Sequence, residues 1–404
     1  MAHRRVVVTG VGVVSSIGIG ADEFWKNLIA GKSGISEVTT FDTADYPIHM
    51  GGEVKNFEAD RFIPKNRLNE MARASRFAVS AAKMAMDDAG VAPENLRSKI
   101  TGAVIGTTMA DIQSLEQIDK YWTKSGEADV WPINILKYPS NSLADHIGYF
   151  FGLNGPNYTI PTACASGNYS IGCAFDLIRS GRADAMIAGG ADPFSRITFT
   201  GFNRLYAMAP DKCRPFDKNR KGMMVGEGSG VLLIEPLESA AARGADIYAE
   251  ILGYGLSCDA HHMTAPKIDG IIKVMERAVS NSGINKEDVG YISAHGTGTP
   301  ANDKTECAAI KKVFGEKYKN ISVSSIKSML GHTMGAASAI EAVTCCLAIK
   351  EQKVPPTINY ETPDEECDID CVPNKAKTRK VEVALNNSFA FGGNNACVVF
   401  KKYH

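Results

Sequence analysis

The fold follows from one stretch of sequence, Ala85-Met-Asp-Asp-Ala-Gly90-Val-Ala-Pro-Glu94-Asn-Leu96, which recurs as Ala278-Val-Ser-Asn-Ser-Gly283-Ile-Asn-Lys-Glu287-Asp-Val289. Before each copy, apolar residues three or four positions apart predict a helix that ends near the glycine. After each copy come a short β-branched run and a Gly-Thr pair. A chance match of two helix–Gly–strand units is the alternative. We favour an internal duplication, which predicts one body of two halves, 1–245 and 246–404.

Short β-branched runs recur along the chain and alternate with helical patterns. They lack clean polar alternation, so we expect strands that are covered on both faces. This order predicts a layered α/β fold with parallel pairings. The predicted strands are Arg5–Val8, Ala103–Ile105, Ala185–Ile187, Val231–Ile234, Tyr291–Ala294, Ile321–Ser324, Val381–Leu385 and Ala396–Phe400.

Composition excludes several classes of protein. The 404 residues are 44% hydrophobic and 22% charged, which is typical of globular domains rather than disordered or fibrous chains. The formal net charge of −1 removes the overall basic field of a nucleic-acid or anionic-membrane binder. No apolar run approaches the roughly 18 residues of a membrane span. Ten cysteines without a secretory signal indicate free thiols, and we expect a cytoplasmic protein.

One cysteine has the setting of a nucleophile. Cys164 lies where a predicted strand turns into a predicted helix, among the small residues Ala163, Ala165, Ser166 and Gly167. The positive helix end should favour the thiolate, and small neighbours leave room for a substrate carbonyl. A small buried cysteine is the structural alternative, which we prefer for Cys173, Cys345 and Cys346.

Two histidines could complete such a site. His295 in Ala294-His-Gly-Thr-Gly-Thr and His332 in Lys327-Ser-Met-Leu-Gly-His each follow a predicted strand at a glycine-rich turn. Their separation is not a metal-ligand spacing, and no CxxC motif accompanies them, so we predict no metal. His261 and His262 lack this setting, and we interpret them as structural.

The remaining glycine-rich turns carry weaker signals. Backbone N–H groups of the turn in Ser388-Phe-Ala-Phe391-Gly-Gly393 could act as oxyanion donors, or the turn could be an ordinary one. Gly226-Glu-Gly-Ser-Gly230 is not a dinucleotide fingerprint, and the chain has no phosphate-binding GxxxxGK[ST] loop. We therefore predict no cofactor.

These blocks together resemble the signature motifs of β-ketoacyl-acyl carrier protein synthases, the Cys-His-His condensing enzymes of the second type. The matching motifs are Thr162-Ala-Cys164-Ala-Ser-Gly, Ala294-His295-Gly-Thr-Gly-Thr-Pro300, Lys327-Ser-Met-Leu-Gly-His332 and Asn387-Ser-Phe-Ala-Phe-Gly-Gly393. The resemblance runs from Val6 to Lys401. It implies a thiolase-like fold of two duplicated βαβαβαββ halves in a five-layered αβαβα architecture, usually dimeric.

The resemblance also implies roles for individual residues. Cys164 would accept the acyl group, and His295 and His332 would bind the malonyl carbonyl and stabilise the enolate formed by decarboxylation. Backbone N–H groups of Cys164 and Phe391 would form the oxyanion hole. The further implied roles are a charge pair of Lys327 with Glu306, binding of the phosphopantetheine arm by Thr297 and Thr299, and an acyl pocket or gate at Met109, Phe389 and Phe391.

Departures from the family pattern bear on the pathway. Pro161 and Ala390 stand where fatty-acid enzymes of the family generally carry Ser and Gly, and Asn394-Asn395 replaces their usual Thr-Asn. A Cβ at position 390 should disfavour positive φ and narrow the motion of the gate. These changes favour a type II polyketide or polyene ketosynthase, in a homodimer or paired with a chain-length-factor-like subunit. Housekeeping 3-oxoacyl-[acyl-carrier-protein] synthase II of fatty acid elongation is the alternative.

The resemblance implies an acidic acyl carrier protein as partner, which requires a local basic patch. Candidates are Lys65, Arg67, Arg73, Arg76 and Arg204. A solvated helix face is the structural alternative for each.

Three other functions fit less well. A degradative thiolase would need a second catalytic cysteine in a C-terminal turn, whereas Cys397 lies in a predicted strand. A non-catalytic chain-length subunit would lack the nucleophile. A cysteine hydrolase would need an Asn or Asp orienting residue that no motif supplies.

Overall fold

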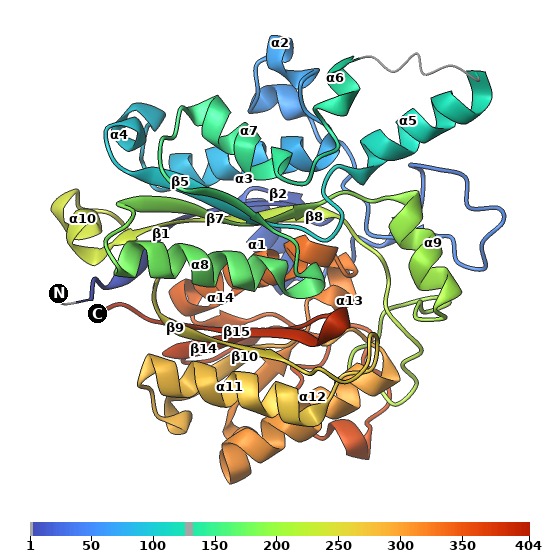
Figure 1. Ribbon diagram of the computed structural model, residues 1–404. Helices are drawn as coiled ribbons and strands as arrows, with labels where there is room; N and C mark the ends of the chain where they lie inside the picture. Colours follow the sequence, from blue (N-terminus) through green and yellow to red (C-terminus); the bar gives the residue numbers. More distant parts are fainter. Residues whose placement is uncertain (1–2, 126–131) are drawn as a thin grey trace.

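The computed structural model describes residues 3–125 and 132–404 (Figure 1). Its strands are β1 (Val6–Ser15), β2 (Gly18–Ile19), β3 (Ser36–Glu37), β4 (Met50–Gly51), β5 (Thr101–Gly106), β6 (Asn157–Ile160), β7 (Ala185–Asp192), β8 (Gly228–Pro236), β9 (Ala249–Cys258), β10 (Val289–Ser293), β11 (Ser322–Ser324), β12 (Lys353–Val354), β13 (Lys377–Thr378), β14 (Val383–Phe389) and β15 (Asn394–Lys401).

The α-helices are α1 (Ala21–Ile29), α2 (Lys65–Leu68), α3 (Arg73–Asp88), α4 (Pro93–Arg97), α5 (Ile112–Ser125), α6 (Pro132–Ile135), α7 (Ser142–Phe151), α8 (Ser166–Arg179), α9 (Arg196–Arg204), α10 (Leu237–Ala242), α11 (Ile268–Ser282), α12 (Pro300–Phe314), α13 (Lys327–Leu330) and α14 (Ala337–Glu351). Short 3₁₀ turns that matter below are η2 (Ala163–Ala165), η5 (Met334–Ala336) and η7 (Phe391–Gly393).

The two halves repeat one strand topology. In the first half the strands lie side by side in the order β6-β5-β7-β8-β1, and in the second in the order β11-β10-β14-β15-β9. If only these five strands of each half are numbered along the chain, both halves have the same order: third, second, fourth, fifth, first. A short antiparallel pairing of β1 with β9, at Val6–Val8 and Ala249–Ile251, joins the two sheets. This agreement confirms the duplication that the repeated segments predict.

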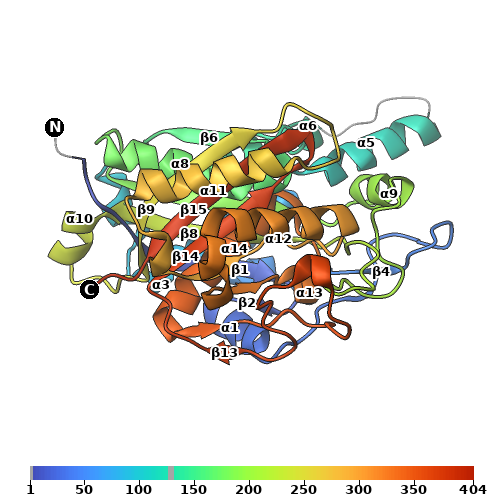
Figure 2. The ribbon, with the colours of Figure 1, turned by 90° about the horizontal axis from the view of Figure 1, so that it is seen from below.

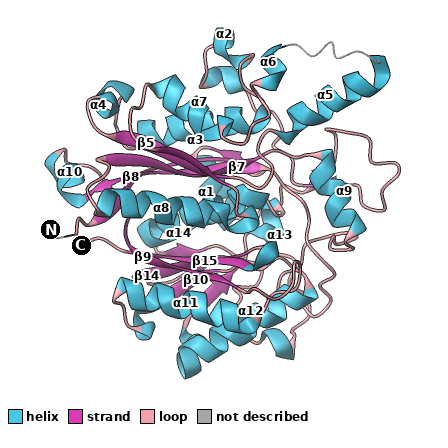
Figure 3. Cartoon of the chain, viewed as in Figure 1, coloured by secondary structure: helices cyan, strands magenta, loops and turns pink. Residues whose placement is uncertain are grey.

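Five layers are visible in Figure 1. From top to bottom they are helices with α3 and α7, the first sheet, a central layer with α8 and α14, the second sheet, and helices α11 and α12. Figure 2 shows the second half from below, with α11 and α12 crossing its strands, and Figure 3 separates the two sheets from the helices by colour. This is the thiolase-like α/β fold.

Helix α14 is buried on all sides because both sheets cover it. Every residue of α14 from Ala337 to Ile349 is buried, and α8 packs against both α14 and β7. A helix enclosed in this way has no solvent-facing stripe, which is why its sequence has no helical alternation of polarity.

The repeated segments occupy equivalent places. Helix α3 packs against β1 and α11 packs against β9, and Gly90 and Gly283 both have φ 64° just after these helices end. Only glycine adopts that conformation without a steric penalty, which explains the repeated glycine.

All eight predicted strands are present, with bounds shifted by a few residues. The expected parallel pairings hold for β5 with β6 and β7, and for β10 with β11 and β14. They are wrong for the predicted strands β1, β8 and β15, which pair antiparallel with their neighbours. The sequence division at 245/246 stays a prediction. All ten cysteines are free, and within the described ranges no helix combines the length and the hydropathy needed to cross a membrane.

Candidate active site

The Cys164 side chain lies on a tight turn between β6 and α8. Ala163, in η2, has φ 50°, a left-handed conformation that is uncommon for a residue with a Cβ. Ser166 holds this turn, since its hydroxyl donates to the carbonyls of Ala163 and Thr107 at 2.6 and 2.9 Å. The sequence prediction of a strand, a turn and a helix around Cys164 is confirmed.

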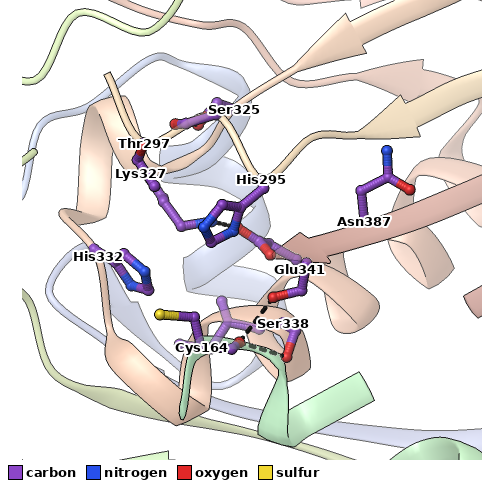
Figure 4. A network of polar contacts seen from close by, with 12 residues as sticks. Cys164, His295, Thr297, Ser325, Lys327, His332, Ser338, Glu341 and Asn387 are labelled. Carbon is purple, nitrogen blue, oxygen red and sulfur yellow. Dashed lines mark hydrogen bonds and ion pairs between the residues drawn. The ribbon is translucent and has the colours of Figure 1, made fainter. Parts of the chain in front are cut away.

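Two hydroxyls of the second half fix the backbone at Cys164. Ser338 Oγ from α14 and Ser388 Oγ from β14 both donate to the Cys164 carbonyl, at 3.2 and 2.8 Å. The first half therefore supplies the cysteine, while the second half anchors it. Figure 4 shows Ser338 directly beside Cys164.

The structure brings Cys164, His295 and His332 together. The thiol sulfur and one ring nitrogen of each histidine all lie within 4.8 Å of one another. The two imidazole rings are nearly perpendicular, at 82°, with centroids 5.4 Å apart. Figure 4 shows the sulfur pointing into the space that both rings face.

The hydrogen bonds of His332 identify its tautomer. Nδ1 accepts from the Met334 backbone N–H at 3.1 Å, so the ring proton lies on Nε2. That Nε2, like Nδ1 of His295, is buried and has no hydrogen-bond partner among the described residues. Burial and the charge of Lys327 hold the pKa of both histidines well below the ordinary value. Both rings are therefore neutral near pH 7 and can donate to an oxygen.

The prediction that the Cys164 environment favours the thiolate is wrong. Burial raises the pKa of the thiol to about 11, although Lys327 and the facing backbone N–H groups of Cys164 and Phe391 oppose that rise. The helix end is present, but Cys164 is only 7% exposed, and desolvation of the charged form has the larger effect. At rest the Cys164 side chain is therefore a neutral thiol.

The two N–H groups that face the sulfur come from opposite halves of the fold, Cys164 from η2 and Phe391 from η7. Donors placed in this way can bind the oxyanion of a tetrahedral intermediate formed at the sulfur.

The predicted charge pair has a different acidic partner. Lys327 forms a buried ion pair with Glu341 on α14 rather than with Glu306, because the start of α13 faces the first turns of α14. Glu306 instead accepts the backbone N–H groups of His295 and Gly296, both at 2.9 Å. It thus fixes the His295 turn directly. Burial raises the pKa of each carboxyl to about 7.

A pocket of about 80 Å³ opens at the three reactive side chains. Thr297, Thr299, Phe389 and Phe391 line it, as predicted for the arm and the gate, and the two threonine hydroxyls are 2.8 Å apart. Phe389 contacts the His295 ring edge to face, with centroids 5.8 Å apart. Phe391 is 39% exposed at the mouth.

The turn at η7, where the gate is predicted, has glycine at both of its positions with positive φ. Gly392 and Gly393 have φ 82° and 79°, whereas Ala390 has φ −107°, which alanine adopts freely. The Cβ of Ala390 is therefore accommodated in this conformation, and it disfavours any other that needs positive φ at that position.

Two residues differ from expectation at this pocket. Met109 is not among the described residues that line it, and its backbone N–H donates to Asp192, so its place in an acyl pocket stays a prediction. His262, interpreted as structural, does line it. Its Nδ1 accepts from the N–H groups of Thr264 and Ala265, so the turn directs the ring to the pocket mouth. No local sequence motif distinguishes it.

The docking candidates divide into exposed and engaged residues. Lys65 and Arg204 are exposed, as expected for a docking surface. Arg67 pairs with Glu70, and Arg76 donates to the Leu68 carbonyl. Arg73 forms two hydrogen bonds with the fully buried Glu227, so its charge is already engaged, and its docking role stays a prediction.

A metal ion could also be bound by the same three side chains, Cys164, His295 and His332. Within the described part of the chain, this is the one cluster of potential metal ligands. A soft cation bound there would occupy the nucleophile. The expectation of a metal-free site stays a prediction.

Comparison with known families agrees with this geometry. The family model "Beta-ketoacyl synthase, N-terminal domain" matches residues 3–240, and "Beta-ketoacyl synthase, C-terminal domain" matches residues 248–361. The chain belongs to the β-ketoacyl synthase family. The resemblance that the four motifs indicate is confirmed.

Curated relatives of this β-ketoacyl synthase are named 3-oxoacyl-[acyl-carrier-protein] synthase 2. The protein of Synechocystis sp. is 43% identical over 100% of this chain and 99% of its own length. That of Staphylococcus aureus is 42% identical over 99% of each.

Two solved structures are also similar to this synthase along its whole length. The structure described as the ishigamide ketosynthase/chain length factor has a TM-score of 0.97 and 45% identity, covering 100% of both chains. A structure of a type II polyketide synthase acyl-carrier protein in complex with its ketosynthase, bound to the hexaketide, has a TM-score of 0.91 and 35% identity, covering 99% of this chain and 100% of that one.

Proposed function

We propose that this β-ketoacyl synthase joins acyl and malonyl units, both carried on an acyl carrier protein, in type II polyketide or polyene assembly. The observation that carries the proposal is the meeting of one buried thiol and two neutral imidazoles within 4.8 Å, beside two backbone N–H donors.

In the loading half-reaction, Cys164 attacks the acyl thioester carbonyl. The bond from the acyl carbon to the sulfur of the arm breaks, and the released arm thiol takes the proton from Cys164. Negative charge develops on the carbonyl oxygen, and the N–H groups of Cys164 and Phe391 stabilise it. Because the free thiol has a raised pKa, its proton must leave as the new bond forms.

In the condensing half-reaction, the malonyl carbonyl binds between the two rings. Its carbon–carboxylate bond breaks and releases carbon dioxide, and the electron pair forms an enolate whose oxygen accepts from His332 Nε2–H and His295. Neutral donors in a buried site stabilise that oxygen more effectively than water does. The enolate carbon then attacks the acyl carbonyl on Cys164, the bond from that carbon to the Cys164 sulfur breaks, and the released thiolate takes up a proton from solvent.

The carrier arm supplies the substrates, so this proposal needs no resident cofactor. Thr297 and Thr299 would bind the arm, since their hydroxyls line the pocket within reach of the reacting thioester. Lys65 and Arg204 would attract the acidic carrier protein. A second subunit, identical or like a chain length factor, would complete a dimer.

Two observations support the polyketide pathway. One is the similarity to a ketosynthase/chain length factor over the full length of both chains. The other is Ala390, whose Cβ limits gate conformations that a glycine would permit. The presence of Cys164 disfavours the non-catalytic partner role.

Fatty acid elongation is the second candidate, because the curated relatives carry the name 3-oxoacyl-[acyl-carrier-protein] synthase 2. The two candidates differ in what accumulates on Cys164. The test supplies the protein, its native neighbours and malonyl-loaded carrier protein, and reads the intact mass of the enzyme. An unreduced poly-β-keto chain or a polyene supports polyketide assembly, and a single saturated acyl group supports fatty acid elongation.

A further inference from the structure

Asp192, at the end of β7, lies where three segments of the active site meet. Its carboxylate is 1% exposed and accepts four hydrogen bonds. Three come from the turn after β5, from Thr107 Oγ1 at 2.7 Å, Thr108 N at 2.7 Å and Met109 N at 3.0 Å. The fourth comes from Gly335 N in η5 of the second half, at 2.6 Å.

The bond to Gly335 places Asp192 next to the support of His332. Two consecutive N–H groups of η5 have different acceptors, since Met334 donates to His332 Nδ1 and Gly335 donates to Asp192. Met334 has φ 52°, an unfavourable conformation for a residue with a side chain. The carboxylate bond therefore restrains a strained residue whose N–H group fixes the His332 tautomer.

Close backbone packing leaves this turn little freedom to shift in other ways. A Cβ at Gly335 would lie 2.5 Å from the Thr107 carbonyl carbon, and a Cβ at Gly190 would lie 2.5 Å from the Gly335 oxygen. Both glycines are required for the approach that brings the Gly335 N–H to the Asp192 carboxylate.

The Cys164 side of the site depends less on this carboxylate. The Cys164 carbonyl is held by Ser338 and Ser388, which make none of the four bonds to Asp192. The carboxylate reaches the Cys164 turn indirectly, through Thr107, whose carbonyl accepts from Ser166. The two half-reactions should consequently respond differently to a change at position 192.

We propose that Asp192 is a positioning residue that sets the orientation and tautomer of His332 for the decarboxylation of the malonyl group. This role rests on the proposed function and goes beyond it, because Asp192 touches neither the thiol nor the histidines. The carboxylate acts through η5, which carries the hydrogen bond to the ring.

The test separates the two half-reactions in Asp192→Asn. The amide keeps the size of the side chain but turns an NH₂ group toward backbone donors. Release of carbon dioxide from malonyl carrier protein should fall about 10- to 100-fold, since an ångström of misplacement costs that much. Acyl loading of Cys164, followed by intact mass, should fall less than threefold. The conservative Asp192→Glu should recover part of the decarboxylation.

Asp111→Asn is the matched control. Asp111 is equally buried and lies on the same turn after β5, but it accepts the backbone N–H groups of Ala74 and Ser75 at the start of α3 rather than that of Gly335 in η5. It should lower the melting temperature and change both half-reactions in the same proportion.

Two results would overturn the proposal. One is an equal loss of loading and decarboxylation in Asp192→Asn. The other is a loss of both rates that follows the fall in melting temperature, as expected for Asp111→Asn. If Asp192→Asn does not fold, Asp192→Glu takes its place in the test. A larger loss of decarboxylation than of loading supports the proposal, and equal losses overturn it. Failure of the wild type to load or to decarboxylate would contradict the proposed function instead, so the two failures are distinguishable.

Discussion

Burial of the Cys164 thiol determines how the nucleophile responds to pH. Its pKa is raised to about 11, chiefly by desolvation, so the thiolate fraction grows about tenfold for each pH unit below that value. The rate of carbamidomethylation of Cys164 by iodoacetamide should rise continuously from pH 7 to 10. Cys164→Ala corrects for the other thiols. A plateau below pH 9 would show that the buried thiol ionises more easily than its burial implies.

Lys327 stabilises negative charge on Cys164 and disfavours positive charge on His295 and His332. Lys327→Met should therefore raise the pKa of the thiol and slow its alkylation at pH 9 several-fold. It should also destabilise the fold by about 3–5 kcal/mol, because Glu341 loses its buried counter-charge.

The double variant Lys327→Met with Glu341→Gln is the control for that effect. It removes both charges, so the free energy of unfolding should recover while alkylation of Cys164 remains slow. Recovery of both properties would assign Lys327 a purely structural role.

At the scale of the elements, the site depends on how closely α8 approaches α14. A Cβ at Gly167 would lie 2.6 Å from the Ala339 nitrogen and 2.8 Å from Ser338 Oγ. Gly167→Ala should lower the free energy of unfolding by about 1–3 kcal/mol, as overpacking does. It should also slow acyl loading, since Ser338 anchors Cys164.

Gly201→Ala on α9 is the matched control, because a Cβ there meets nothing within 4 Å. At that exposed helical position, alanine should leave the free energy of unfolding unchanged or raise it by up to about 1 kcal/mol. Equal destabilisation by the two substitutions, measured in urea, would show that the α8–α14 contact has no special importance.

The elements also show what sequence patterns can predict. Glycine-rich turns after strands indicate the reactive residues, because such turns present side chains at the ends of sheets. They do not indicate Glu341 or Asp192, whose polar bonds connect segments far apart in the chain. Nor could the raised pKa of Cys164 be predicted, since it depends on the burial that the second half provides.

At the scale of the whole molecule, the repeat of one segment predicts the duplication and hence the layers. It does not predict the antiparallel pairings of β8 and β15, near the join of the two sheets, because periodicity carries no information about strand direction. It also does not predict that Arg73 is engaged with Glu227, since the two lie far apart in sequence and only the folded chain brings them together.

Docking of the carrier protein is a property of the molecular surface. Arg204→Glu should raise the KM for a carrier-bound acyl substrate several-fold at low salt, with little change in kcat, because rim charges act mainly on encounter. The same variant should leave turnover of an acyl-pantetheine thioester unchanged. Lys380→Glu, another exposed charge reversal, should have no effect on either substrate. Equal KM values for Arg204→Glu and wild type would remove Arg204 from the docking surface.

The central claim is that Cys164 carries the growing acyl group. The most direct measurement incubates wild type, Cys164→Ala and Cys258→Ala with a carrier protein loaded with an acyl thioester and reads the intact mass of each. Cys258 is an exposed thiol, so its variant controls for nonspecific acylation. We expect one acyl group on wild type and on Cys258→Ala, and none on a folded Cys164→Ala. Full acylation of Cys164→Ala would contradict the account.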